Sequence, residues 1–134
     1  MTNTQHEPKI ASSKLSSCPN RPNCVSSLTT DDEQYVPPFE FVDPPLVEMR
    51  RLEKLIGSMQ GATITEVTEH YLHAEFRSRV FHFVDDVELF WDQSERKCHV
   101  RSASRTGYYD FGQNRKRIEE IRLMFTESRN TRSN

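Results

Sequence analysis

Chemically versatile side chains gather between residues 101 and 115, where a predicted strand leads through a glycine-containing turn into a predicted helix. The set combines forked cations, hydroxyls, a carboxylate and an amide: Arg101, Ser102, Ser104, Arg105, Asp110, Asn114 and Arg115. A helix start presents unpaired backbone N–H groups and about half a positive charge to an anion. Guanidinium groups add a planar fork that suits carboxylate or phosphate. The segment therefore has the chemistry of an anion-binding corner.

The same corner can also be internally neutral. Asp110 is placed to cap the helix and to pair with Arg105 or Arg115, which would leave no charge for a ligand. Our leading interpretation is a non-catalytic domain that binds an anionic small molecule or an anionic protein partner here. In that interpretation the three arginines receive the anion, the two serines and Asn114 donate hydrogen bonds, and Asp110 orients the arginines.

A second polar cluster, formed by Asp85, Asp86 and Glu88, lies within a predicted strand. Such carboxylates can hold a divalent cation or supply an acid and a base. Because side chains alternate along a strand, Asp86 and Glu88 share one face and Asp85 points to the other. The alternative is a set of cross-strand ion pairs, each contributing about 0.2–1 kcal/mol. The predicted partners on neighbouring strands are His73, Glu75, Arg77, His99 and Arg101.

Cys18 and Cys24 flank a proline-rich loop with the sequence CPNRPNC. Their spacing fits neither the redox C-x-x-C motif nor the usual structural zinc sites. A loop closed by a disulfide, two packed thiols and a reactive thiol all remain open. A reactive thiol or the carboxylates would make a small thiol- or carboxylate-dependent enzyme, which is our second interpretation. The third is a purely structural or assembly protein.

No metal site and no cofactor are expected from the sequence. Four histidines, His70, His73, His82 and His99, show no i, i+4 helical pairing. His70 and His73 fall on opposite faces of a strand, so they cannot share a ligand there. Cys98, the third cysteine, lies in a predicted strand and is expected to be a buried thiol.

Length and composition favour one domain. With 134 residues, 34 % of them hydrophobic, and a mean hydropathy of -0.77, the chain needs to exclude a polar tail from its core. The 18 basic and 20 acidic residues give a net charge of -2, which argues against a nucleic-acid-binding protein. The sequence has no apolar run of about 18 residues to suggest a membrane span and no secretion signal in residues 1–17. We therefore expect a cytoplasmic protein with reduced cysteines.

The chain is predicted to divide into a disordered tail over residues 1–17, a single domain over 18–127 and a frayed end over 128–134. Prolines and turn-forming residues predict that residues 18–41 are a loop or a strap along a sheet edge. A helix follows, with Asp43 as candidate N-cap, Pro44 at the first helical position and Gly61 at its end.

Alternating residues predict four strands, over 63–69, 71–77, 84–91 and 97–104, before a last helix that begins near 112–114. The order of elements predicts an α+β fold, a four-stranded antiparallel sheet with both helices covering one face. Trp91 should be at least partly buried on that face. The helical residues Leu52, Leu55 and Ile56 should meet strand residues in the core, and these are Phe76, Leu89 and Val100.

Three blocks of the sequence resemble a known family. They cover residues 18–27 (CPNRPNCVSS), 83–88 (FVDDVE) and 101–119 (RSASRTGYYDFGQNRKRIE), and they come in the family's order. On these blocks the chain is similar to the family called domain of unknown function 1499, from Cys18 to about Phe125. Many members resemble exported or lipid-anchored bacterial proteins and some look plastid-targeted, whereas this chain shows no signal ahead of Cys18. The resemblance implies the architecture and the choice of residues, and it brings no established reaction.

Overall fold

The computed structural model describes residues 15–80 and 83–133. The predicted tail therefore lies outside the described residues except for 15–17, where Leu15 is buried. His82 also lies outside them. Residues 18–127, the predicted domain, contain the five strands found in the described residues and most of the last helix. No helix in these two described ranges is long and apolar enough to cross a membrane.

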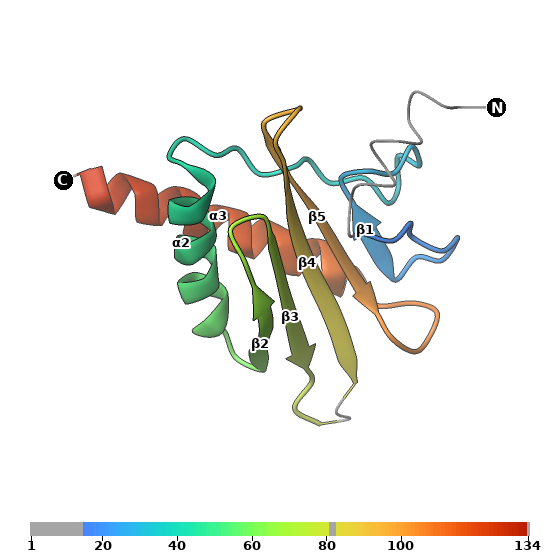
Figure 1. Cartoon of the computed structure of the whole chain (residues 1–134). Helices are drawn as coiled ribbons and strands as arrows, with labels where there is room; N and C mark the ends of the chain where they lie inside the picture. The colour runs from blue at the N-terminus through green and yellow to red at the C-terminus, as the bar shows by residue number, and fades with distance from the viewer. Residues whose placement is uncertain (1–14, 81–82, 134) are drawn as a thin grey trace.

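A five-stranded antiparallel sheet with the strand order β1-β5-β4-β3-β2 forms the centre of the fold (Figure 1). Its strands are β1 (Cys24–Ser26), β2 (Ala62–Val67), β3 (Tyr71–Arg77), β4 (Val84–Asp92) and β5 (Lys97–Ser104). The predicted sheet was one strand short, because it lacked β1 at the edge beside β5. Three residues within a proline-rich stretch are too few to show the alternation by which strands are recognised.

Two helices, α2 (Pro45–Gly57) and α3 (Gln113–Ser133), complete the α+β fold. Figure 1 shows α3 running behind the sheet and α2 next to it. Both helices contribute to one hydrophobic core with the strands, including Met49, Leu52, Ile56, Leu72, Leu89, Val100, Ile118, Ile121 and Phe125. We call the sheet face that carries Leu72, Leu89 and Val100 the helix-covered face, and the opposite one the outer face. The predicted stripe on the last helix is confirmed.

Helix α2 begins one residue later than the sequence predicted. Pro44 is the N-cap in place of Asp43, and Pro45 is the first helical residue. Proline has no side-chain hydrogen-bond acceptor, so the fully buried Glu48 supplies the acceptor at this helix start. Its carboxylate accepts hydrogen bonds from the backbone N–H groups of Val42 (2.8 Å) and Asp43 (3.0 Å). A helical glutamate thus fixes the chain that enters the helix, as the glutamate of a capping box does.

Gly61 lies in the turn after α2, and the helix itself ends earlier, at Gly57. The backbone of Gly61 has a φ of +82°, and a Cβ atom there would lie 2.6 Å from the carbonyl oxygen of Arg77. Arg77 also donates its N–H to the Gly61 carbonyl at 2.9 Å. Only glycine tolerates both the left-handed conformation and the close approach, so this residue lets β2 start against the end of β3.

The burial predicted for the strand residues is confirmed. Trp91 is 4 % exposed, and its ring stacks on that of Phe41 with centroids 4.9 Å apart. Cys98 is fully buried, and burial raises the pKa of its thiol far above the ordinary value. The predicted strap lies along β5, where Phe39 and Cys98 exchange backbone hydrogen bonds of 2.8 and 3.1 Å. The proline-rich segment therefore closes one side of the core.

Replacing Leu55 with alanine is expected to lower the free energy of unfolding by about 1–2 kcal/mol. Leu55 is only partly buried against the core, whereas Leu52 and Ile56 are fully buried. The loss should therefore be smaller than the about 2–5 kcal/mol typical of a fully buried leucine. Urea unfolding measures it, with Leu46→Ala on the same helix as a control that changes stability by at most about 0.5 kcal/mol. Equal, negligible effects of both changes would mean that Leu55 does not help to pack α2 against the core.

Candidate functional site

The sheet divides the predicted corner between its two faces. Side chains alternate along β5, so Ser102 and Ser104 follow Val100 onto the helix-covered face. Arg101 and Arg105 project from the outer face, where their partners lie. The sequence interpretation brought these arginines and hydroxyls together because they are neighbours along the chain. The alternation of the strand separates them by the thickness of the sheet.

On the outer face, carboxylates from two neighbouring strands hold Arg105. Its guanidinium donates to Asp86 at 2.8 and 2.9 Å and to Glu75 at 2.7 Å. Arg101 lies 3.6 Å from Glu88. These contacts are the cross-strand ion pairs that the sequence offered as the alternative for the acidic cluster. Asp86 and Glu88 each face a guanidinium.

Two titrating groups of the outer face have shifted pKa values. Hydrogen bonds from Arg105 hold the pKa of Asp86 below its usual range, with a weaker contribution from His73 at 2.7 Å, while partial burial acts in the opposite direction. Burial, together with a 2.5 Å hydrogen bond to Glu88, raises the pKa of Tyr71 far above its ordinary value. Both shifts move titration away from neutral pH, whereas a catalytic acid or base needs a pKa near the working pH.

Replacing Arg105 with glutamine is expected to raise the pKa of Asp86 toward its ordinary value, and NMR titration of the carboxyl carbon measures the change. The folded-state pKa is depressed, so the pair stabilises the fold above the unfolded value of about 3.9 and loses this effect as the pH falls through the lower folded value. The stability loss at pH 7 should be small because solvent screens an exposed pair. Arg115→Gln is the control, and an Asp86 pKa that responds equally to both changes would contradict a specific pair.

On the helix-covered face, Asn114 is the centre of a buried hydrogen-bond network. Its side chain is fully buried, and its Oδ1 accepts a 2.6 Å hydrogen bond from the Ser102 hydroxyl. Its Nδ2 group donates to Asp110 (2.7 Å), to the Ser104 hydroxyl (3.0 Å) and to the Asn23 carbonyl (3.2 Å). The network joins β5, the residue before β1 and the start of α3, which makes Asn114 an architectural residue.

Asp110 caps helix α3. Its carboxylate accepts hydrogen bonds from the backbone N–H groups of Gly112 and Asn114, both at 2.9 Å. The sequence left open whether Asp110 orients arginines or caps the helix and pairs with one of them. The capping role is present, while Arg105 is paired with other acids on the far side of the sheet.

Arg115 contacts a loop close to the sheet edge. Its guanidinium donates to the backbone carbonyls of Tyr35 at 2.8 Å and of Glu33 at 2.6 Å. Loop carbonyls lack the partners that strands and helices provide, so a forked donor that reaches two of them fixes the local backbone. Arg115 thus fastens the strap to α3.

Arg117 is a residue of the corner that the sequence interpretation missed. It is 8 % exposed, and its Nη1 donates to Asp85 at 2.8 Å and to the Asn114 amide oxygen at 3.2 Å. Its guanidinium also lies over the ring of Phe76, 4.6 Å from the centroid. Two signals could have found it. One helical turn separates it from Ile121 on the buried stripe, and the strand period places Asp85 on the same side of the sheet.

A pocket of about 560 Å³ opens beside Arg117, between the end of β3, the start of β4 and the loop from β5 to α3. These connections lie at one end of the sheet in Figure 1. We call it the corner pocket. Its lining includes four aromatic residues, three arginines and two aspartates: Phe76, Phe83, Tyr109, Phe111, Arg77, Arg79, Arg117, Asp85 and Asp110. From the predicted corner, only Ser104 and Asp110 belong to this lining.

Aromatic side chains at the rim of the corner pocket are exposed to solvent. Phe111 is 87 % exposed, Tyr109 is 60 % exposed and Phe83 is 59 % exposed. Tyr109 and Phe111 contact each other edge to face with centroids 4.8 Å apart. Phe111 also has a φ of +56°, a left-handed conformation that bulky residues rarely adopt. Exposed rings on a locally strained backbone are features of binding loops.

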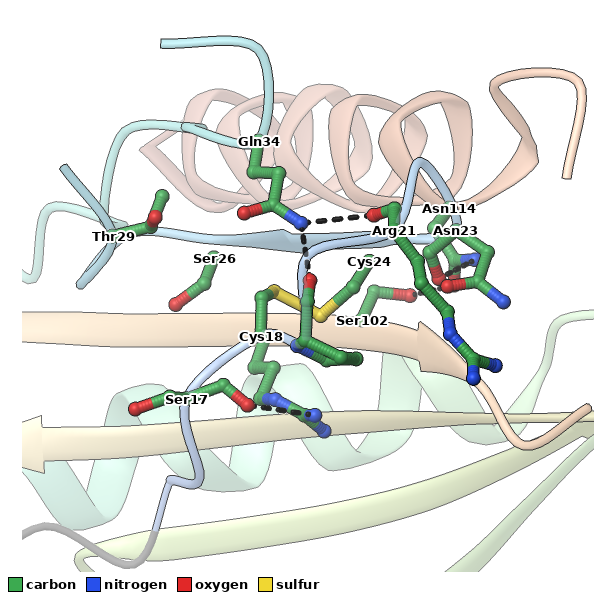
Figure 2. The surroundings of a disulfide bond; sticks show 12 residues. Ser17, Cys18, Arg21, Asn23, Cys24, Ser26, Thr29, Gln34, Ser102 and Asn114 are labelled. Atoms are coloured by element: carbon green, nitrogen blue, oxygen red, sulfur yellow. Dashed lines mark hydrogen bonds between the residues drawn. A yellow bond between two sulfur atoms is a disulfide. The ribbon is translucent and has the colours of Figure 1, made fainter. Parts of the chain in front are cut away.

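Figure 2 shows Cys18 and Cys24 joined by a disulfide bond. Gln34 braces the closed loop by donating to two of its carbonyls at 2.8 and 2.9 Å. Of the three alternatives left by the sequence, the disulfide-closed loop is the one present, so the expectation of reduced loop cysteines does not describe this structure. The free cysteine among the described residues is Cys98, and it is buried. A thiol nucleophile therefore has no accessible candidate in the described residues.

The hairpin between β4 and β5 contains three side chains whose oxygen and nitrogen atoms could ligate a cation. Ligand atoms of Asp92, Glu95 and His99 lie within 4.8 Å of one another. His99 Nε2 is 2.6 Å from Glu95 Oε1 and must carry a proton to bond it, while Nδ1 lies 2.9 Å from the Ser27 hydroxyl. One Asp92 oxygen accepts backbone N–H groups of the turn. His99 therefore pairs with a turn residue and not with the acidic cluster, contrary to the sequence interpretation.

The comparisons with known proteins agree with the resemblance found on the three sequence blocks. The model of the family described as "Protein of unknown function (DUF1499)" matches residues 14–125. That range includes all five strands, α2 and the greater part of α3. No curated protein and no solved structure matches the chain. The chain belongs to the DUF1499 family of proteins of unknown function.

Proposed function

We propose that this protein is a non-catalytic binding domain that receives an anionic ligand in the corner pocket. The observation that carries the proposal is the pocket itself, in which guanidinium groups and solvent-exposed aromatic rings line one volume of about 560 Å³. Ligand sites typically occupy about 300–1,000 Å³ and combine apolar walls with a few placed polar groups. The proposed site lies at the strand-to-helix corner predicted from the sequence. The arginines proposed to serve it are Arg79 and Arg117, and not the predicted Arg101, Arg105 and Arg115.

Arg117 is the central cation of the proposed site. Its hydrogen bonds to Asp85 and Asn114 both use Nη1, so the other guanidinium nitrogens keep donors for a ligand. Asp85 and the ring of Phe76 hold the guanidinium in place before a ligand arrives. A preorganised donor loses little freedom on binding, which favours affinity. The exposed Arg79 adds positive charge on another wall of the pocket.

The contacts of the candidate catalytic groups support a non-catalytic role. Asp85 pairs with Arg117, Asp86 with Arg105, and Glu88 accepts the Tyr71 hydroxyl. The loop cysteines form a disulfide. These carboxylates are therefore engaged by other side chains of the protein, and neither loop cysteine is a free thiol that could act as a nucleophile.

The test is an NMR titration of the full-length chain, labelled with ¹⁵N, against inorganic phosphate, citrate, decanoate and 2-naphthoate. At least one anion is expected to shift the backbone amides of Thr106, Gly107 and Gln113, which line the pocket. Arg79→Gln should weaken that binding about tenfold, equivalent to about 1.4 kcal/mol. The change removes one wall charge and leaves the Arg117 pair intact.

Arg105→Gln is the matched control, because it removes the same charge from the outer face. Binding should be unchanged in this variant, since Arg105 contacts Asp86 and Glu75 and does not line the pocket. Equal weakening in both variants would point to non-specific electrostatic attraction and overturn the proposal. So would the absence of pocket shifts with all four anions.

A further inference from the structure

We infer that the disulfide between Cys18 and Cys24 regulates the corner pocket, because it fixes Asn23 and Asn23 tethers one wall of the pocket. This inference rests on the proposed function and names the regulation of the same site. The disulfide is closed in the structure, and this is the form that should bind the ligand. Reduction by a thiol reagent should release the wall and weaken binding.

Asn23 connects the disulfide loop to the pocket. It is buried and directly precedes Cys24, the first residue of β1. Its side-chain Nδ2 donates to the carbonyl of Gly107 at 2.8 Å. Its own carbonyl accepts the Ser104 N–H at 3.0 Å and the Asn114 Nδ2 group at 3.2 Å (Figure 2). Gly107 and Ser104 both line the corner pocket, so Asn23 holds part of its wall.

The tether matters because little else holds this wall. Residues 106–109 belong to the loop from β5 to α3. Within the described ranges, the bond from Asn23 is the one hydrogen bond that this segment forms with the rest of the protein. At Gly107 the backbone has a φ of +82°, and a Cβ atom there would meet nothing within 4 Å. A glycine in open space has wide conformational freedom, so loss of the bond would let the segment move.

The disulfide restricts the chain that leads to Asn23. A loop closed by a covalent bond lacks the conformational freedom that the open chain regains. Cys24 is buried and paired with Ala103 in the sheet, whereas Cys18 is only half-buried. After reduction, Cys18 would therefore be the end that moves, together with the residues between it and Asn23.

Cys18 is also the sulfur that a reductant can approach. It lines a hollow of about 210 Å³ together with Ser16, Ser17 and Leu28. A dithiol such as dithiothreitol would attack the Cys18 sulfur as a thiolate and displace the Cys24 thiolate, which takes up a proton. The second thiol of the reagent then displaces Cys18. The protein disulfide gains two electrons and two protons, and the reagent is oxidised to a cyclic disulfide.

The experiment compares the oxidised and the reduced full-length protein. Without any ligand, ¹⁵N relaxation gives the backbone order parameters of Thr106, Gly107 and Tyr108. These should fall from about 0.85 to below about 0.6 when dithiothreitol is added. Inorganic phosphate, citrate, decanoate and 2-naphthoate are then titrated into both forms. An anion that binds the oxidised form should bind the reduced form about tenfold more weakly, because the wall is no longer preorganised.

Two variants assign the effect to the tether. Asn23→Ala keeps the disulfide and removes the bond to Gly107, so its loop should be mobile even when oxidised. Cys18→Ser removes the disulfide and keeps Asn23, so it should match the reduced protein and no longer respond to dithiothreitol. Asn20→Ala is the matched control, because it removes an exposed asparagine of the same disulfide loop and should change neither measurement.

The outcomes separate this inference from the proposed function. Order parameters that stay the same on reduction would overturn the regulation, and so would a mobile loop with unchanged affinity; an anion that binds would leave the proposed function standing. Loss of the amide shift dispersion of the whole sheet would also overturn it, since the disulfide would then hold the fold and not the pocket. If no anion shifts the pocket amides of either form, the proposed function falls and its regulation falls with it.

Discussion

Replacing Glu48 with glutamine is expected to lower the free energy of unfolding by about 3–5 kcal/mol, because it removes the charge from a buried ion-pair centre. Glu48 is fully buried in α2. Its carboxylate contacts the guanidinium of Arg51 and accepts a 3.0 Å hydrogen bond from Arg129 of α3. It also accepts the two backbone N–H groups that precede α2. A glutamine keeps one acceptor oxygen and removes the Glu48 charge from two largely buried guanidinium groups, while Arg51 keeps its contact with Asp43 at 3.3 Å.

Urea unfolding at neutral pH measures this loss. Glu53→Gln, which makes the same chemical change at a half-buried position of α2, is the control and should alter stability by at most about 0.5 kcal/mol. Similar small effects of both substitutions would mean that Glu48 does not hold α2, α3 and the incoming strap together.

Replacing Asn114 with alanine is expected to lower the free energy of unfolding by about 2–4 kcal/mol, since buried groups are left without hydrogen-bond partners. Five partners lose bonds at once: the Ser102 hydroxyl, the Ser104 hydroxyl, the Asn23 carbonyl, the Asp110 carboxylate and the Arg117 guanidinium. The cap of α3 survives, because Asp110 still accepts backbone N–H groups. The loss therefore reports the side-chain network.

Two comparison variants make the Asn114 measurement specific. Asn20→Ala removes an exposed asparagine from the disulfide loop and should change stability by at most about 0.5 kcal/mol. Asp110→Ala removes the helix cap and should cost about 0.5–2 kcal/mol. A loss for Asn114→Ala no larger than for Asn20→Ala would contradict the network.

The corner shows where sequence reasoning reached its limit. The sequence identified Asp110 and Ser104 as part of a polar corner, and both line the pocket. It also grouped Arg101 and Arg105, whose partners lie on the outer face of the sheet, with Arg115, whose partners lie in the strap. The grouping assumed that residues close in sequence are also close in space. Along β5, however, every second side chain points to the opposite face of the sheet. Arg117 escaped notice because a helical arginine is ordinarily read as solvent-exposed.

The order of elements, their burial and the membership of the core could be predicted because local periodicity encodes them. Alternation along β3 and β4 and the helical spacing of Ile118, Ile121 and Phe125 depend on residues close in sequence. Strand β1 could not be predicted, since three residues show no period and their pairing with β5 is a long-range contact. The start of α2 was misplaced for a different reason: the acceptor of the preceding N–H groups is Glu48, inside the helix, and not a residue at its start.

The α+β class, the residues that face the core and the family could be predicted without a structure, since each depends on local pattern or on matching blocks. The pairing of charged side chains, in contrast, depends on the tertiary structure. Asp85 and Asp86 are neighbours in sequence, yet Asp85 pairs with Arg117 on the helix-covered face and Asp86 with Arg105 on the outer face. Tertiary structure also formed the corner pocket, because its walls come from the ends of β3 and β4 and from the loop before α3. Segments so distant in sequence become one surface only when the sheet aligns them.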